Sequence, residues 1–363
     1  MSLIHQIALT LVQNVGHVTA KSLLASFGTA EAVFSASLEE LLQVEGVGTV
    51  TAGQILRTDA LRVAEQQLKL LEKHQVEPLF YTDERYPQRL KHCFDAPVLL
   101  YYRGTADLNH PRIVSIVGTR MATSYGLMLC EQLAETLKHY HVLVVSGLAY
   151  GIDVAIHQQS LQHSIPTVGV LGHGLDRLYP AAHRQIAAEM LKNGGLLTEF
   201  PLYTNPDKEN FPRRNRIIAG ISDVTIVVEA ALKGGALITA EVANSYNRDV
   251  YAFPGRTTNQ FSEGCNFLIK TNRAGLIAHP RDLAYYMGWE AEASLQPVRQ
   301  TAMAIGLNAP ETAIMKVLQS SSQRIDELAI QAGMQQSKLA IHLLNLEIRG
   351  LIISLPGNIY QVV

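Results

Sequence analysis

From Pro97 onward, short apolar runs rich in Val and Ile alternate with longer helical stretches, and this alternation restricts the folds open to the chain. Strands that are apolar throughout must be buried on both faces, and helices between them make successive strands parallel. The middle of the chain is therefore expected to form a Rossmann-like α/β domain whose ligand site lies beyond the carboxyl ends of the strands. The expected strands are 112–118, 142–147, 166–172, 195–200, 224–230, 249–255 and 274–279.

Glycine and polar residues follow several of these runs, at the ends where a parallel sheet would collect them in one crevice. The segments Gly118-Thr119-Arg120 and Ser146–Asp153 are examples. Gly118 does not open a Gly-x-Gly-x-x-Gly string, and the sequence contains no Gly-x-x-x-x-Gly-Lys-Ser/Thr string. Nicotinamide-dinucleotide and P-loop ATPase functions are therefore disfavoured, and we expect no cofactor. Glycine-rich turns can still hold phosphate groups through their backbone amides.

A basic segment, Phe-Pro-Arg-Arg-Asn-Arg at 211–216, stands directly before an apolar helical run. Pro212 fits the start of a helix, where a missing backbone donor costs nothing, so the three arginines fall in the first turns. Backbone amides there also attract anions. Residues 207–216 carry four cations against two carboxylates, a net charge of +2 in a chain of net charge −2. An anionic ligand and a solvated helix start with carboxylate partners from the same chain both remain open.

Phosphate-binding turns, arginines and an aromatic side chain together favour single-stranded nucleic acid. Phosphates without a cofactor motif indicate a polymer backbone, and Phe211 beside arginines offers a stacking surface for unpaired bases. We expect Arg120 and Arg214 to neutralise phosphates from opposite walls of one groove. No residue is assigned a catalytic or metal-binding role. The candidate DNA-contacting residues are Gly118, Thr119, Arg120, Ser146, Gly147, Ala149, Gly151, Lys208, Phe211, Arg213, Arg214, Asn215, Arg216, Gly234 and Gly235.

Acidic and imidazole groups near the strand ends keep a hydrolase open as an alternative. The possible acids and bases are Asp153, His157, Asp176 and Glu199. In the simpler interpretation, Asp153 caps a helix that begins at Val154, and His157, four residues further on, shares its face.

The N-terminal part contains an internal repeat, in which residues 12–24 align with residues 44–56 at a spacing of 32. Each copy resembles a helix-hairpin-helix, whose turn amides can face a nucleic-acid phosphate. Asn14 replaces the first glycine of the turn, but Asn tolerates a left-handed backbone, so the turn is expected to survive. Neither turn contains Lys or Arg, so packing or protein contact stays open beside phosphate binding. A helix is expected over 60–77.

The C-terminal part is expected to be a winged helix that follows a linker. Gly and Pro mark residues 288–308 as the linker. Residues 309–363 hold four Lys or Arg against four Asp or Glu, and this neutrality favours contact with protein, while contact with duplex DNA stays open. The expected elements are helices near 311–319, 324–332 and 336–349, a strand at 351–355, a turn at 356–358 and a strand at 359–362.

The composition fits two or three packed domains, with 363 residues of which 47% are hydrophobic and 17% charged. No apolar run approaches the ~18–20 residues of a membrane helix, and the chain start lacks the plan of a signal peptide, so we expect a cytoplasmic protein. Cys93, Cys130 and Cys265 are widely spaced, which favours reduced structural thiols over disulfides or zinc ligands. A pI near 6.7 disfavours coating of duplex DNA by bulk charge and favours a focused groove.

Six strings follow one another across the middle of the chain: Gly118–Gly126, Ser146–Asp153, Gly172–Pro180, Phe211–Gly220, Gly235–Ala240 and Ser262–Ile269. Their residues and their order resemble the DNA-processing protein A family (DprA, also called Smf). The resemblance implies single-stranded DNA binding without known catalysis, dimerisation through the Rossmann-like domain, and loading of the RecA recombinase on incoming DNA during natural transformation. It also implies a helix-hairpin-helix (SAM-like) domain over 1–75, a Rossmann-like domain over 76–287 and a winged helix over 309–363.

The sequence departs from the family pattern at three positions. Thr119 stands where the family often has Ser, Gly234 where Ser-Gly is common, and His183 where Asn usually follows Tyr-Pro. Thr119 keeps a hydroxyl and Gly234 a small turn, whereas His183 changes what its loop can contribute. Two other functional classes stay open. One is a phosphoribohydrolase-like enzyme acting on nucleotide monophosphates, although Glu229 precedes its glycines here and follows them in such enzymes. The other is a transcription regulator using the winged helix.

Overall fold

The computed structural model of the chain describes residues 2–289, 307–319, 321–355 and 359–362. These residues fall into two compact units. The first contains an N-terminal helical domain and an α/β domain packed together, and the second is the C-terminal domain. Most of the expected linker, residues 290–306, and the expected turn at 356–358 lie outside the described residues. Among the described helices, none is both long and apolar enough to cross a membrane.

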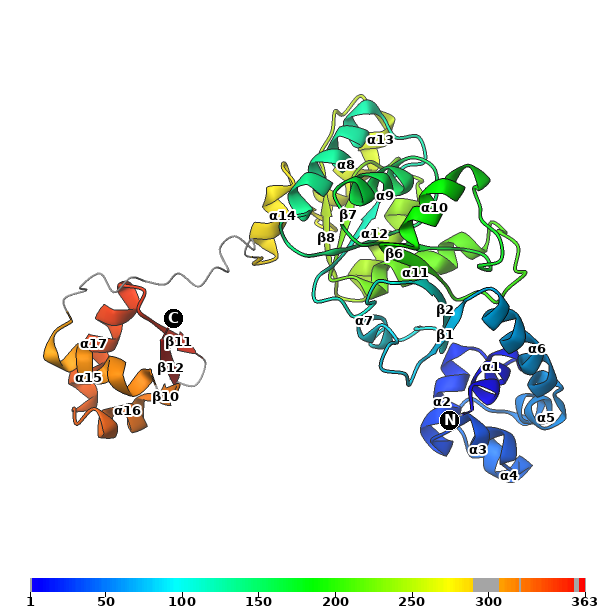
Figure 1. Cartoon of the computed structure of the whole chain (residues 1–363), viewed down its shortest axis with the longest axis horizontal. Coiled ribbons are helices and arrows are strands. Elements are labelled where there is room, and N and C mark those ends of the chain that lie inside the picture. The colour runs from blue at the N-terminus through cyan, green and yellow to red at the C-terminus, as the bar shows by residue number, and fades with distance from the viewer. Residues whose placement is uncertain (1, 290–306, 320, 356–358, 363) are drawn as a thin grey trace. The chain divides into compact units, whose positions relative to one another are not determined.

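The helical domain contains two helix–turn–helix hairpins, as the internal repeat predicts (Figure 1). Asn14 has φ 67° in the first turn and Gly46 has φ 81° in the second, so the left-handed turn at Asn14 is confirmed. The last helix ends at Lys73 rather than at residue 77, because Gln75, with φ 55°, turns the chain into the first strand. The helices are α1 (Leu3–Leu11), α2 (His17–Phe27), α3 (Ala30–Ser35), α4 (Leu38–Leu42), α5 (Thr49–Arg57) and α6 (Ala60–Lys73).

The described part of the α/β domain holds a nine-stranded sheet in the order β1-β2-β6-β5-β4-β3-β7-β8-β9. All pairs from β6 to β9 are parallel, which confirms the predicted fold class. β1 and β2 form an antiparallel edge that was not predicted. The strands are β1 (Glu77–Phe80), β2 (Leu99–Gly104), β3 (Ile113–Val117), β4 (Leu143–Ser146), β5 (Thr167–Val170), β6 (Gly194–Thr198), β7 (Val224–Val227), β8 (Asp249–Ala252) and β9 (Gly275–Leu276).

The path of the chain through this sheet fixes where a ligand can bind. The chain runs outward from β3 through β4 and β5 to β6, and then returns to β7 on the other side of β3. Strand order therefore reverses between β3 and β7. In open α/β sheets, ligands bind outside the carboxyl ends of the strands at such a reversal.

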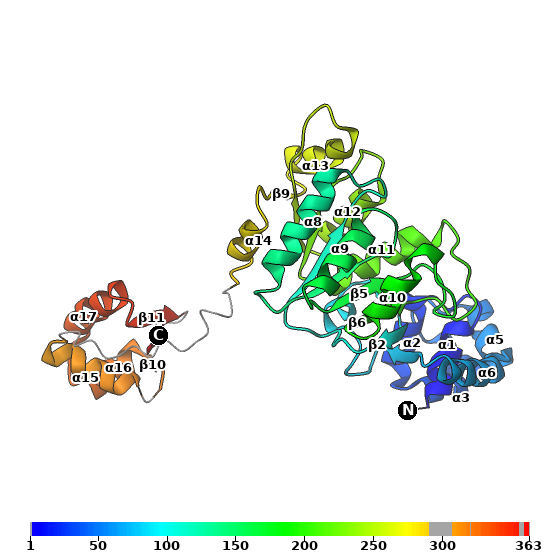
Figure 2. The same ribbon diagram turned by 45° about the horizontal axis from the view of Figure 1, so that its top comes forward.

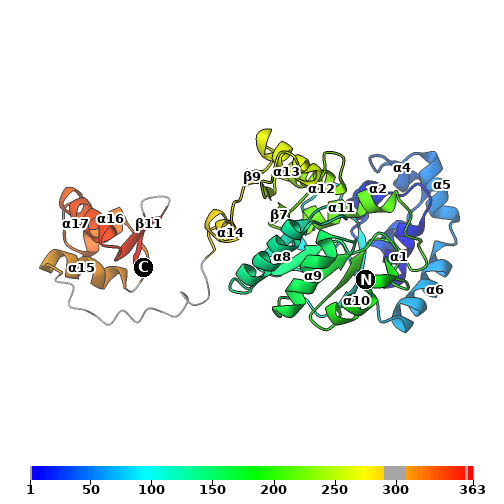
Figure 3. The same cartoon turned by 90° about the horizontal axis from the view of Figure 1, so that it is seen from above.

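Helices cover both faces of the sheet. One face carries α8, α9 and α10, which lie side by side (Figure 2), and the other carries α11 and α12 (Figure 3), with α7 packed against α11. Buried residues of the helical domain and of the β2 and β6 region belong to one continuous apolar cluster, so the helical domain packs firmly on this edge. The helices are α7 (Gln88–Lys91), α8 (Ser124–Leu137), α9 (Ile152–Gln162), α10 (Arg184–Met190), α11 (Asn210–Ile221), α12 (Gly235–Ser245), α13 (Gln260–Lys270) and α14 (Arg281–Tyr286).

The prediction that Asp153 caps a helix starting at Val154 is wrong. The helix α9 begins earlier, at Ile152, and its N-cap is Gly151. Gly151 has φ 79°, and a Cβ there would lie 2.2 Å from the carbonyl oxygen of Thr119, so only glycine fits. Asp153 lies inside the first turn of α9 and is buried.

The C-terminal unit is a winged helix, as predicted, and its described residues form three helices and a small antiparallel sheet in the order β10-β12-β11. The short strand β10 was not predicted. The exposed side of α17 carries Ile341, Leu344 and Ile348, spaced three and four residues apart, so these apolar side chains line one stripe. The elements are α15 (Ala309–Leu318), β10 (Gln323–Arg324), α16 (Ile325–Gln331), α17 (Gln336–Ile348), β11 (Ile352–Leu355) and β12 (Ile359–Val362).

Candidate nucleic-acid interface

A cavity lies beyond the carboxyl ends of β3, β4 and β5, beside the first turns of α11. It is open to solvent, and the space between its walls, which includes part of that solvent, is about 380 Å³. The sheet topology explains this position, since β3 borders the reversal of strand order. Four predicted contact residues line this space, called the Phe211 cavity here: Arg120, Ala149, Phe211 and Arg214.

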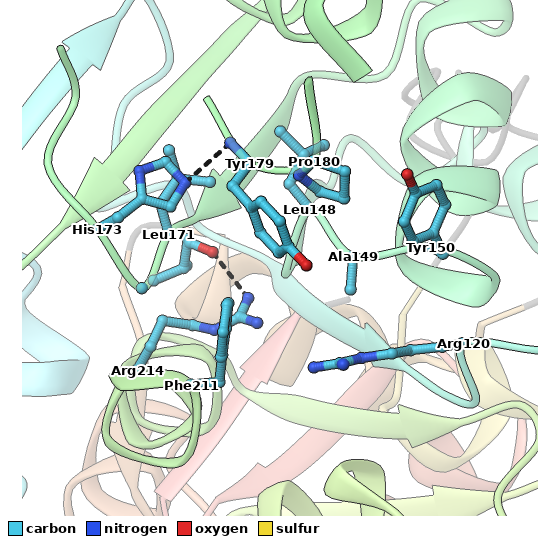
Figure 4. A pocket seen from close by; sticks show the side chains of 12 residues that line it. Arg120, Leu148, Ala149, Tyr150, Leu171, His173, Tyr179, Pro180, Phe211 and Arg214 are labelled. Atoms are coloured by element: carbon cyan, nitrogen blue, oxygen red, sulfur yellow. Dashed lines mark hydrogen bonds between the residues drawn. The ribbon is translucent and has the colours of Figure 1, made fainter. Parts of the chain in front are cut away.

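An aromatic and cationic cluster forms the wall of the Phe211 cavity. The ring centroid of Phe211 lies 6.1 Å from that of Tyr179, with the planes tilted by 44°. The guanidinium carbon of Arg120 lies 5.6 Å from the Phe211 centroid, within the range of a cation–π contact. Figure 4 shows Arg120 and Arg214 reaching toward this cluster from opposite sides. The cluster therefore combines flat apolar faces with an exposed positive charge, the chemistry that single-stranded nucleic acid needs.

Phe211 is positioned by the start of α11 and by the absence of a side chain opposite it. The helix begins at Asn210, so Pro212 and the arginines fall in its first turns, as predicted. A Cβ at Gly172, after β5, would come within 3.2 Å of the Phe211 ring. The ring therefore packs directly against the backbone at Gly172.

Arg214 is the buried cation of the cavity, with 5% of its surface exposed. Its Nη1 donates to the carbonyl of Val170 over 2.7 Å. A Cβ at Gly147 would lie 2.1 Å from this Nη1 and 2.3 Å from Oδ2 of Asp153, so Gly147 leaves the space in which both groups sit. Burial raises the pKa of Asp153 and lowers the pKa of Arg214, and the charge of each opposes the shift of the other.

Arg213 and Arg216 are oriented toward Glu199, at the end of β6, and neither lines the Phe211 cavity. Arg216 forms an ion pair with the Glu199 carboxylate and also donates to the carbonyl of Asp95. Its side chain is only 11% exposed. For Arg216, the carboxylate of Glu199 is therefore the partner of the cation, in place of an anionic ligand. The Arg213 side chain is 58% exposed, lies 3.9 Å from Glu199 and stacks over Phe200.

The glycine-rich turns frame the cavity through their backbone. The amide of Thr119 donates to the carbonyl of Glu229 over 2.7 Å, which holds the turn after Gly118 against β7. A Cβ on Gly118 would lie 2.4 Å from the side chain of Ile152, so the turn and α9 are in close contact. The Ser146 hydroxyl is buried and donates to the carbonyl of Ile116, so it faces the sheet interior.

The other predicted residues lie around the start of α11 and α12. Lys208 is exposed in the loop before α11. The Asn215 side chain donates to the carbonyl of Gly235 over 3.4 Å, which links α11 to the first residue of α12, directly after Gly234. His183 is buried, and its Nδ1 lies 2.9 Å from the carbonyl of Leu148. His183 therefore supports the loop after β4.

Eight of the residues that line the cavity were absent from the predicted set, and three of them carry an aromatic or imidazole ring: Tyr150, His173 and Tyr179. Tyr150 and Tyr179 are both about half exposed, so their rings are available to a ligand. The amide of Tyr179 donates to Nε2 of His173 over 3.2 Å, and Nδ1 of His173 lies 2.9 Å from the carbonyl of Gly174. Burial lowers the pKa of His173, which keeps it neutral in this role. Aromatic residues in loops after apolar strands were the available sequence signal.

The four groups of the hydrolase alternative do not line the Phe211 cavity. His157 is buried and lies 2.6 Å from both the Thr167 hydroxyl and the Gly147 carbonyl, and burial lowers its pKa to about 4. Asp176 accepts from the amide of Tyr203 and pairs with its neighbour in sequence. Each group is thus engaged in contacts that hold loops or helices in place.

The family is identified by the α/β domain. Residues 77–288, more than half of the chain, match the model of a family described as DNA recombination-mediator protein A. The chain belongs to this family. Residues 298–358 match the DprA winged helix domain and residues 7–60 match a helix-hairpin-helix motif. The resemblance found in the sequence is therefore confirmed.

Relatives in other organisms cover most of the chain. It is 33% identical to Protein Smf of Synechocystis sp. over 391 residues, which cover 98% of this chain and 97% of that protein. It is 36% identical to Protein Smf of Escherichia coli over 284 residues, 76% of this chain and 74% of that protein. Both exceed the level at which a shared fold and family are expected.

Two solved structures of family members resemble this structure. DNA processing protein A from Streptococcus pneumoniae gives a TM-score of 0.69 at 30% identity, covering 79% of this chain and 98% of that one. DNA processing protein A from Helicobacter pylori gives a TM-score of 0.54 at 29% identity, covering 60% of this chain and 98% of that one. The latter structure is described as giving insight into a single-stranded DNA binding mode.

Proposed function

We propose that this protein binds single-stranded DNA at the Phe211 cavity and delivers it to the RecA recombinase during natural transformation. The observation that carries the proposal is the aromatic cluster of the partly buried Phe211 and the half-exposed Tyr179, flanked by Arg120 at the carboxyl ends of the strands. Membership in the recombination-mediator family and the solved relative described by its single-stranded DNA binding mode support it.

The geometry of this cluster favours a single strand over a duplex. Unstacked bases can lie against Phe211 and Tyr179, at about 1 to 3 kcal/mol for each stacked base. Bases inside a duplex are already stacked and paired, so their faces cannot reach these rings without unstacking. The exposed Arg120, Arg213 and Lys208 would neutralise backbone phosphates around the cluster.

Fluorescence anisotropy with a fifty-nucleotide strand and with its duplex tests this proposal. We expect the strand to bind more tightly at every salt concentration, and equal affinities would refute single-strand binding at the cavity. The same preparation incubated with nucleotide monophosphates tests the phosphoribohydrolase alternative, which predicts release of free base.

We propose a cytoplasmic protein that dimerises through the α/β domain, as implied for the family. For the winged helix we propose contact with protein, because Ile341, Leu344 and Ile348 occupy the exposed side of α17 where a duplex-binding helix would present polar and basic groups. Light scattering of the purified protein, with and without RecA and a single strand, measures both associations.

A further inference from the structure

His17, in the helical domain, makes direct contact with the α/β domain. It is the first residue of α2, immediately after the turn of the first hairpin. Its Nδ1 accepts from the backbone N–H of Val98 at 3.4 Å, and its Nε2 donates to Oε2 of Glu199 at 3.1 Å. The two contacts together assign the proton of the neutral ring to Nε2. The ring thus bridges the segment before β2 and the end of β6.

The carboxylate of Glu199 is surrounded by one histidine and two arginines. Its side chain is 1% exposed, and the oxygen that accepts from His17 also pairs with Arg216 and lies 3.9 Å from Arg213. The other oxygen, Oε1, is buried and has no hydrogen-bond partner within the described part of the chain. Burial opposes the charged form of Glu199, but His17, Arg216 and Arg213 outweigh it and hold its pKa below the usual range.

Arg213 is the cation that can respond to a change at Glu199. Arg216 already forms a close pair and is mostly buried, whereas the Arg213 side chain is 58% exposed. Arg213 lies on α11 outside the Phe211 cavity, with its exposed guanidinium over the ring of Phe200 at the end of β6, where a strand that leaves the cavity across the start of α11 would meet it. A buried carboxylate that loses one donor costs free energy until another donor replaces it. Arg213, 3.9 Å from Glu199 and not in a close ion pair, can move to supply that donor.

We infer that His17 is a positioning residue for the DNA site: by donating to Glu199 it leaves Arg213 free to bind a backbone phosphate. This inference rests on the proposed function, since Arg213 matters here only if a strand passes α11. It gives the helical domain a role in strand binding that requires no contact between its hairpins and DNA. Loss of the His17 donor draws Arg213 onto Glu199 and removes one phosphate contact.

The test compares His17→Ala with Arg213→Ala, their double variant and His17→Gln. We expect His17→Ala and Arg213→Ala each to reduce the slope of log affinity against log salt by ~0.7, one single-strand phosphate contact. The double variant should lose no more than Arg213→Ala alone, because both changes remove the same contact. The Gln side chain can supply a donor to Glu199, so His17→Gln should keep the wild-type slope.

Lys21→Ala is the matched control. Lys21 lies on the same helix and donates across the same interface to the carbonyls of Cys93 and Phe94, but it makes no contact with Glu199. It should alter stability without changing the slope. An equal fall in slope for Lys21→Ala would show that loosening of the interface is sufficient, and would overturn the inference.

A measurement without DNA separates this inference from the proposed function. Phenylglyoxal modifies accessible arginines, and peptide mass spectrometry reports each site. In His17→Ala, modification of Arg213 should slow toward the low rate of the buried Arg216, with the wild-type rate restored in His17→Gln. Unchanged Arg213 reactivity would overturn the inference even if strand binding holds. A wild-type protein without preference for single strands would instead refute the proposed function, and the reactivity result would stand by itself.

Discussion

Replacement of Arg120 by Ala isolates the contribution of one exposed phosphate contact. Arg120 lies in the turn after β3, is exposed, and contacts the face of Phe211 without an ion-pair partner among the described residues. Loss of one single-strand phosphate contact lowers the slope of log affinity against log salt by ~0.7. At 0.1 M salt this corresponds to a loss of about fivefold in affinity, or about 1 kcal/mol. The effect should be the same for oligonucleotides of any base composition, because phosphate contacts do not read sequence.

The assay is fluorescence anisotropy of labelled strands at four or more salt concentrations, together with thermal melting. Lys192→Ala provides a control. Lys192 is exposed on the loop before β6, at the amino end of that strand and so away from the Phe211 cavity, and its replacement removes the same unit of charge. Lys192→Ala should leave the slope unchanged. If Arg120→Ala also leaves it unchanged, the Phe211 cavity does not hold the DNA backbone, and the proposed function fails at its central residue.

Arg214→Ala, in contrast, should lower stability, because it leaves the buried Asp153 without its cation. We expect the free energy of unfolding to fall by about 3 to 5 kcal/mol. The midpoint of thermal unfolding should drop, while the slope of log affinity against log salt should change little. Phe211→Ala should weaken binding by about 1 to 3 kcal/mol for one stacked base, and Phe211→Tyr should retain most of the affinity in the same titration. Removal of residues 309–363 should leave strand binding nearly intact, and a loss of tenfold or more, about 1.4 kcal/mol, would show that the winged helix holds DNA. Acid should destabilise the α/β domain through His157, because folding lowers the pKa of this side chain to about 4. The unfolded chain takes up a proton at this position as the pH falls below about 6.5, so the free energy of unfolding should decline from there toward pH 4. Denaturant titrations of His157→Gln should show a weaker decline.

The sequence predicted the inner parallel strands β3, β4, β5 and β7 well because each lies in a mostly apolar run between helices. The edge strand β1 contains Pro78, which argues against a strand, whereas β2 does contain an apolar run, Leu99–Tyr102, that the prediction missed. Pairing of β2 with β6, antiparallel to the rest, depends on contacts between residues far apart in the chain. Local periodicity cannot report such a pairing, and it becomes visible only in the folded sheet.

The candidate site was predicted at the level of segments and less well at the level of side chains. The strand-end rule brought Arg120, Ala149 and Phe211 to one cavity, because the rule depends only on topology. Tyr179 was missed, since its position depends on a loop held by His173 rather than on any repeat in the sequence. Asp153 was misread as a cap because the helix start depends on the tight approach of Gly151 to Thr119.

The arginines of α11 show how helical geometry divides one basic segment into different roles. Successive residues of an α-helix are rotated by about 100°, so Arg213 and Arg216 lie about 60° apart around the axis, while Arg214 lies about 160° from Arg216. Arg213 and Arg216 accordingly share Glu199, and Arg214 enters the cavity beside Phe211, three residues before it. A charge count over the segment adds all three equally. Since Arg216 is paired and Arg214 is buried, Arg213 is the arginine of the three that is exposed to an incoming strand. Its guanidinium is available to a phosphate when His17 supplies the hydrogen bond to Glu199, and is held at Glu199 when His17 does not.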